Sequence, residues 1–151
     1  MRPRLGSTAR IDPNDPHRAI YLPIVRDNLP ESLSLFDGAD PSLVVAERAT
    51  TTVPAQSLFL MNNSFVQKMS ESAAERLVKK TPAESDRVRE AYLLFFGRPP
   101  SGKEMATAEQ FLKDYRKTTQ KDRVSPSRQE KLVWAAFCQA LFGSAEFLYR
   151  N

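Results

Sequence analysis

The chain has little of the residues on which catalysis and cofactor binding most often depend. Its 151 residues include one histidine, one cysteine and five glycines. A single cysteine excludes an internal disulfide framework and a cysteine-rich zinc or iron–sulfur site. No glycine-rich phosphate loop, haem-attachment motif or metal-ligand spacing occurs in the sequence. We therefore expect no cofactor and no metal to be held by this chain.

Long apolar runs are also missing. No run reaches the roughly 18 apolar residues that a membrane-spanning helix needs, and the first residues lack the apolar core of a secretory signal. The sequence predicts no membrane span. Residues 1–18 are polar, include two Asp-Pro steps, and are predicted to form a loop or linker.

The sequence positions of His17 and Cys138, the residues with the most reactive side chains, do not favour a catalytic role. His17 follows a proline in the polar N-terminal segment, where nothing fixes its surroundings. Cys138 lies in an apolar helical segment beside Trp134 and Leu141 at helical spacing, so we interpret it as a small core residue. No catalytic residue is predicted.

Hydrophobic residues at 41% and charged residues at 26% are typical of a globular domain with one core. Periodic apolar positions and end signals predict short helices after Pro30 and Pro41 and longer helices at 54–60, 63–81, 85–96, 101–116 and 126–142, with a last turn or two at 144–150. Residues 19–26 form at most one short strand, because Pro23 interrupts them. The prediction is an all-α, irregular helical bundle over residues 19–151 with an extended N-terminal arm.

Several helices carry specific expectations. Asn63 or Asn62 is expected to cap the 63–81 helix, whose apolar face is predicted to be Val66, Met69, Ala73 and Leu77. Gly97 is expected to end the 85–96 helix in the left-handed conformation.

Ser101 and Glu104 have the spacing of a capping box, in which each side chain binds the other residue's backbone amide. Leu93, Leu94 and Phe96 make the second half of the 85–96 helix apolar on nearly all sides, which predicts a central position for it.

A polar region beside the 54–60 helix is the best candidate for an interaction surface. It concentrates hydrogen-bonding side chains next to apolar ones: Asp37, Asp40, Arg48, Thr50, Thr51, Thr52, Gln56, Asn62 and Asn63. The structural alternative, which the residue types favour, is that these side chains cap helices and satisfy irregular backbone. Asp37 and Asp40 are in that case a turn former and a helix cap.

A net charge of +4 draws attention to a basic stretch around residue 120. It comprises Lys113, Arg116, Lys117, Lys121, Arg123, Arg128 and Lys131, interrupted by Asp114, Asp122 and Glu130. Because no recognition helix or aromatic–basic interleaving accompanies it, a solvated or partner-facing surface is favoured over a nucleic-acid contact.

Four sequence blocks carry a resemblance to a known family. They are 18–26 (RAIYLPIVR), 36–42 (FDGADPS), 51–62 (TTVPAQSLFLMN), and the pair 96–100 (FGRPP) with 147–149 (FLY). In order and spacing they resemble a C-terminal domain of unknown function found in multidomain proteins of planctomycetes, which often carry a cytochrome c-type domain. The resemblance covers about residues 17–151. It implies a chain that is the C-terminal part of a larger protein at the periplasm or cell surface, with any haem outside these residues.

The resulting hypothesis is a non-catalytic structural or interaction module whose partner is the upstream part of the parent protein or another protein. Two alternatives stay open. One is part of an enzyme acting on extracellular carbohydrate or a similar substrate, completed by upstream residues. The other is weak nucleic-acid binding through the basic stretch. Self-association through an apolar patch at residues 20–25 is also expected if that patch is exposed.

Overall fold

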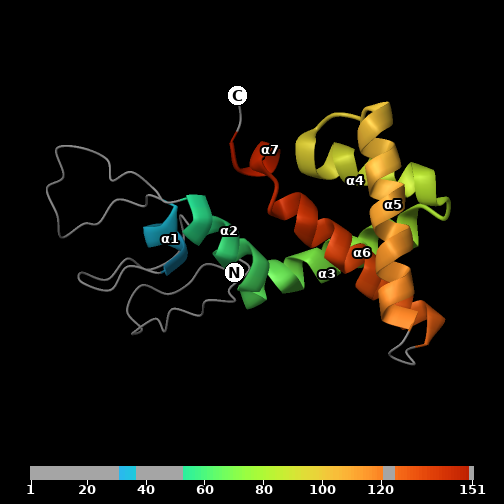
Figure 1. The fold of residues 1–151 in the computed structure, drawn as a ribbon, viewed down its shortest axis with the longest axis horizontal. Helices are drawn as coiled ribbons and strands as arrows, with labels where there is room; N and C mark the ends of the chain where they lie inside the picture. The colour runs from blue at the N-terminus through green and yellow to red at the C-terminus, as the bar shows by residue number, and fades with distance from the viewer. Residues whose placement is uncertain (1–30, 37–52, 121–124, 150–151) are drawn as a thin grey trace, which may run out of the picture. The chain divides into compact units, whose positions relative to one another are not determined.

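A computed structural model describes residues 31–36, 53–120 and 125–149. Within these ranges every regular element is a helix, which confirms the all-α class (Figure 1). The helices are α1 (Glu31–Leu35), α2 (Val53–Asn62), α3 (Ser64–Lys80), α4 (Glu84–Phe96), α5 (Gly102–Thr119), α6 (Pro126–Phe142) and α7 (Ala145–Leu148). The predicted strand at 19–26, the helix after Pro41 and the N-terminal arm lie outside the described residues.

The chain divides into two compact units, Met1–Leu58 and Phe59–Asn151. In the first unit, the side-chain amide of Gln56 on α2 donates a hydrogen bond to the carbonyl of Leu35 at the end of α1, with an N···O distance of 3.0 Å. Gln56 is buried. The contact therefore joins two helices that are 21 residues apart in the chain.

Helix ends in the second unit follow the local sequence signals. Asn63 caps α3 by accepting a hydrogen bond from the amide of Phe65, and Gly97 ends α4 in the left-handed conformation with φ of 72°. A side chain at this φ is strained, so glycine is the favoured residue. Both halves of the Ser101–Glu104 capping box are present at the start of α5. Each of these ends was predicted.

The core of the second unit lies between α3, α4, α5 and α6. Helix α6 packs against α3 and α5, as Figure 1 shows from its place among them. The buried residues form one cluster: Ala74, Leu77, Val88, Ala91, Tyr92, Ala108, Leu112, Val133, Trp134, Phe137, Cys138 and Leu141. Cys138 is fully buried, and this burial raises its thiol pKa to about 12. Its interpretation as a core residue is confirmed.

One expectation about helix faces is wrong, and another is confirmed only in part. The second half of α4 is not central, because Leu93 and Leu94 are 49% and 43% exposed. The buried residues of α4 are Arg87, Val88, Ala91 and Tyr92, which precede this apolar run. On α3 the buried residues are Val66, Ser70, Ala74 and Leu77. The predicted Val66 and Leu77 are therefore confirmed, while the predicted Met69 and Ala73 are only partly buried. Ser70 fits this buried face because its hydroxyl bonds the carbonyl of Val66 at 2.8 Å.

Shortening Leu112 tests this core. Leu112 is fully buried, whereas Leu132 on α6 is 39% exposed. We expect Leu112→Ala to lower the free energy of unfolding by about 2–5 kcal/mol, because the change removes apolar contacts and leaves a cavity. Leu132→Ala should cost less than about 1 kcal/mol. Urea unfolding followed by circular dichroism measures both, and equal losses would contradict the assigned core.

Candidate interaction surface

Only part of the predicted polar surface lies in the described residues. Asp37, Asp40, Arg48, Thr50, Thr51 and Thr52 lie outside them. Gln56 and Asn63 are engaged in the contacts with Leu35 and Phe65 given above, and Asn62 is exposed at the end of α2. For Gln56 and Asn63 the structure thus shows contacts of the kind that the structural alternative predicted. The surface as a whole stays a prediction.

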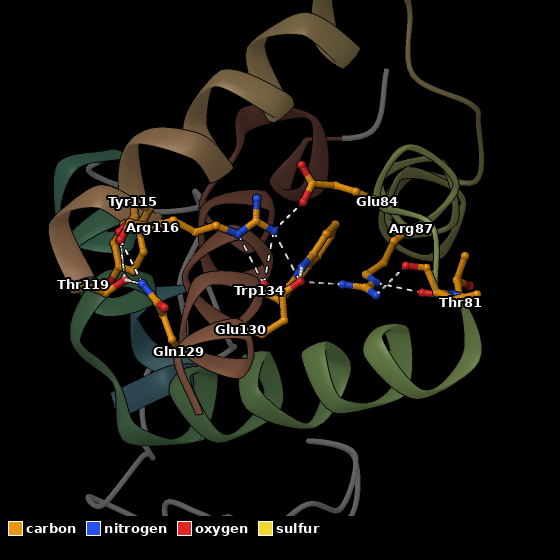
Figure 2. Close-up of polar contacts among 10 residues, drawn as sticks. Thr81, Glu84, Arg87, Tyr115, Arg116, Thr119, Gln129, Glu130 and Trp134 are labelled. Carbon is orange, nitrogen blue, oxygen red and sulfur yellow. Dashed lines mark hydrogen bonds and ion pairs between the residues drawn. The ribbon is translucent and has the colours of Figure 1, made fainter. Parts of the chain in front are cut away.

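The strongest polar cluster of the second unit is centred on Glu130 of α6 (Figure 2). Its carboxylate accepts hydrogen bonds from Arg87 of α4 at 2.8 Å, from Trp134 of α6 at 2.9 Å, and from Arg116 of α5 at 3.2 Å. Arg116 also pairs with Glu84 of α4. Glu130 therefore connects three helices through a single carboxylate.

Arg87 is the most buried cation of this cluster, with a side chain only 8% exposed. Its guanidinium donates further hydrogen bonds to the carbonyls of Thr81 and Pro82, at 2.9 and 3.1 Å, and lies 4.9 Å from the centre of the Trp134 ring. These carbonyls belong to the α3–α4 connection. A buried charge is costly unless it is paired and hydrogen-bonded, and Arg87 meets both conditions.

The electrostatics of the cluster follow from its geometry. Burial of Glu130 pushes its carboxyl pKa upward, but the hydrogen bond from Trp134 and the charge of Arg116 outweigh burial and leave the pKa below its ordinary value. The hydrogen bond to Glu84 leads the causes that raise the pKa of Arg116. Both groups therefore stay charged at neutral pH, and the cluster is an ion network that holds helices together.

Three of the five described members of the predicted basic stretch pair with carboxylates. Among its described members, Arg116 belongs to the Glu130 cluster, Lys117 pairs with Asp114 at 3.1 Å, and Lys131 pairs with Glu75 of α3 at 2.9 Å. Lys121 and Arg123 lie outside the described residues. These carboxylates neutralise positive charge that would otherwise be available to bind the phosphate backbone of a nucleic acid.

A second charged centre lies where α4 turns into α5. Arg98 binds Glu104 of α5 through two hydrogen bonds of 2.7 and 3.0 Å, and Glu146 of α7 through two of 2.6 and 2.7 Å. Its remaining donor binds the carbonyl of Pro99 at 3.1 Å. All five N–H donors of a guanidinium are thereby used. The bonds from Arg98 and Ser101 lower the pKa of Glu104 to about 2.

A hollow lined by both polar and apolar groups borders this centre. The ends of α4 and α7 line it, and its exposed large side chains are Leu93, Leu94, Phe147 and Tyr149, between 39% and 49% exposed. Apolar side chains of this size gathered on one surface are typical of a binding site. We call this group, together with Phe95, Phe96 and Arg98, the α4–α7 surface.

Sequence reasoning missed the α4–α7 surface for an identifiable reason. The sequence shows the apolar run 93–96, but periodicity does not reveal that Leu93 and Leu94 stay exposed. In the sequence, Arg98 is recognisable only as part of the 96–100 block. Its partner Glu146 is 48 residues away, so no local pattern connects them.

A metal-binding cluster and a membrane-spanning helix are both absent from the described residues. They contain no group of three or more histidine, cysteine, aspartate or glutamate side chains placed to hold a metal ion. Helices long and apolar enough to cross a bilayer were likewise not found in that part of the chain.

The described residues thus define a small all-α fold with exposed apolar side chains at the ends of α4 and α7. Comparison with family models gives a match over residues 5–112 to PSD1, a family described as a protein of unknown function (DUF1553). The chain belongs to this family. The match starts earlier and ends earlier than the expected 17–151, and it includes the sequence blocks up to 96–100. Searches of curated proteins and of solved structures found no match.

Removing the charge of Glu130 tests the ion network. Glu130→Gln should lower the free energy of unfolding by about 1–3 kcal/mol, because Arg87 and Arg116 lose their shared counter-charge in a partly buried place. Glu90 provides a matched control, since its side chain is also 31% exposed but pairs only with the exposed Lys80. Glu90→Gln should cost less than about 1 kcal/mol. Equal effects in urea unfolding would show that the network contributes no more than a surface pair.

Acid titration tests the Arg98 centre. Because the folded-state pKa of Glu104 is depressed to about 2, its contribution to stability is present above the ordinary glutamate pKa of about 4.3 and is lost as pH falls from there toward 2. The difference in unfolding free energy between wild type and Glu104→Gln should therefore shrink over this range. Carbon-detected NMR titration of the carboxyl group provides the direct check. A midpoint near 4.3 would refute the depressed pKa.

Proposed function

We propose that this chain is a non-catalytic interaction module of a larger, extracytoplasmic protein associated with cytochrome c. The observation that carries the interaction role is the α4–α7 surface, where four large apolar side chains stay between 39% and 49% exposed next to a charged centre. Burying such side chains contributes roughly 25 cal/mol per Å² of apolar surface. The association with cytochrome c, the planctomycete origin and the compartment rest on the sequence resemblance alone.

Charged groups support the same proposal. Arg87, Arg116 and Glu130 hold α4, α5 and α6 together, and Arg98 is saturated by Glu104 and Glu146. Charged side chains that pair with one another across helices stabilise the fold. Leu93 and Leu94 of α4, by contrast, stay 49% and 43% exposed, so a partner that covers them would gain the free energy of burying them.

The polar region Asp37–Asn63 is proposed as a second contact area of the module. It supplies hydrogen-bonding groups, among which Arg48 is the group best suited to pair with a carboxylate on the partner. Polar groups of this kind set the orientation of a complex more than its strength. The two areas are proposed independently, and a partner need not touch both.

The test measures binding between the full chain and the polypeptide encoded by the rest of its gene, by biolayer interferometry. Leu94→Asp should weaken binding about ten-fold or more, because it places a charge in the apolar contact. Leu132→Asp is the matched control, since Leu132 is 39% and Leu94 43% exposed.

Arg48→Ala should weaken the same association and leave the helical circular dichroism unchanged. Equal binding by wild type, Leu94→Asp and Arg48→Ala would refute the proposed function. An effect confined to one of the two variants would assign the contact to that area.

A further inference from the structure

The charged centre around Arg98 can accept further hydrogen bonds but cannot donate any. Arg98 uses all of its N–H donors on Glu104, Glu146 and the carbonyl of Pro99. Each carboxylate oxygen of Glu146 accepts one of these bonds, although an ionised carboxylate has about four lone-pair sites. The side chain of Glu146 is 43% exposed. A group that pairs with this centre from outside therefore has to be a hydrogen-bond donor.

The same centre carries an excess of negative charge. Arg98 contributes one positive charge, whereas Glu104 and Glu146 contribute one negative charge each. Glu104 stays ionised, because the bonds from Arg98 and Ser101 lower its pKa to about 2. The pKa of Tyr92 is raised first by burial and next by the charge of Glu104, which outweighs the opposing charge of Arg98. The centre therefore attracts a cation.

Exposed apolar side chains adjoin this charge. Leu93, Leu94 and Glu146 line the same hollow, and the two leucines are 49% and 43% exposed. The ring of Phe147 packs on that of Phe95, with their centres 6.0 Å apart, so α7 itself forms one wall of the hollow. A molecule bound there meets apolar surface and a hydrogen-bond acceptor side by side.

We propose that the α4–α7 surface binds a partner segment that carries apolar side chains next to a lysine or an arginine. The apolar side chains cover Leu93 and Leu94, and the cation donates to the unused acceptor sites of Glu146 while α7 stays in place. An acidic residue at the same position of the partner is repelled by Glu104 and Glu146. This inference rests on the proposed function and specifies the charge of the partner at that surface.

The probes are three tetrapeptides, LFLK, LFLQ and LFLE, acetylated and amidated at their ends so that only the last side chain differs in charge. Each is titrated into the ¹⁵N-labelled full chain at low salt. We expect LFLK to shift the amide signals of Leu93 to Arg98 and of Ala145 to Tyr149. Its half-saturation concentration should be at least about three-fold lower than that of LFLE, with LFLQ between them. The difference should shrink at about 0.5 M salt, because exposed charges are screened there.

Glu146→Gln separates charge from packing. The change balances the charges of the centre and keeps an oxygen that accepts from Arg98, so LFLK and LFLE should then differ by less than about two-fold. Glu90→Gln is the matched control, since Glu90 also lies in an ion pair but with Lys80, and it should leave the preference for LFLK unchanged. Leu94→Ala should weaken all three peptides by a similar factor, because it removes apolar contact without changing the charge.

Absence of shifts with LFLK up to about 5 mM would overturn the proposal. Equal half-saturation by LFLK and LFLE, or a preference for LFLK that survives Glu146→Gln, would overturn it as well. Self-association of the wild type that Leu94→Asp abolishes, seen by sedimentation equilibrium, would make a second copy the occupant and also contradict it. If Leu94→Asp weakens the association with the parent polypeptide while the peptides show no preference for a cation, the proposed function stands and only this inference falls.

Discussion

The structure of the second unit depends on one carboxylate. Glu130 receives hydrogen bonds from Arg87, Arg116 and Trp134, and so connects α4, α5 and α6 at the edge of the apolar core. Apolar packing alone is non-directional and tolerates sliding of helices. The bonds of Arg87 to the carbonyls of Thr81 and Pro82 add direction, because they also fix the connection from α3 to α4.

This arrangement determines which surface is left for binding. Helix α6 packs against α3 and α5, and the end of α4 contacts the four-residue helix α7 through Phe95 and Phe147. Leu93 and Leu94 stay exposed as a result. Arg98 stabilises this end through Glu104 and Glu146, so the same residue that completes the fold also marks the border of the apolar surface.

The sequence predicted those features that depend on neighbouring residues. Asn63, Gly97 and the Ser101–Glu104 pair act within one helical turn, and their roles were correctly predicted. The network was not predicted, because Arg87 and Glu130 are 43 residues apart and pair only after three helices have packed. The exposure of Leu93 and Leu94 was missed for the same reason, since periodicity reports an apolar face and not what covers it. Of the predicted polar surface, Gln56 and Asn63 show internal contacts, while Arg48 lies outside the described residues.

The central claim is that charged side chains of this module are committed to holding its helices, with Glu130 and Arg87 coupled across the core edge. A double-mutant cycle of Arg87→Met and Glu130→Gln, measured by urea unfolding, tests it most directly. The account predicts a coupling free energy of at least about 1 kcal/mol, because the two groups share one network. Additive effects, with a coupling below about 0.3 kcal/mol, would contradict it.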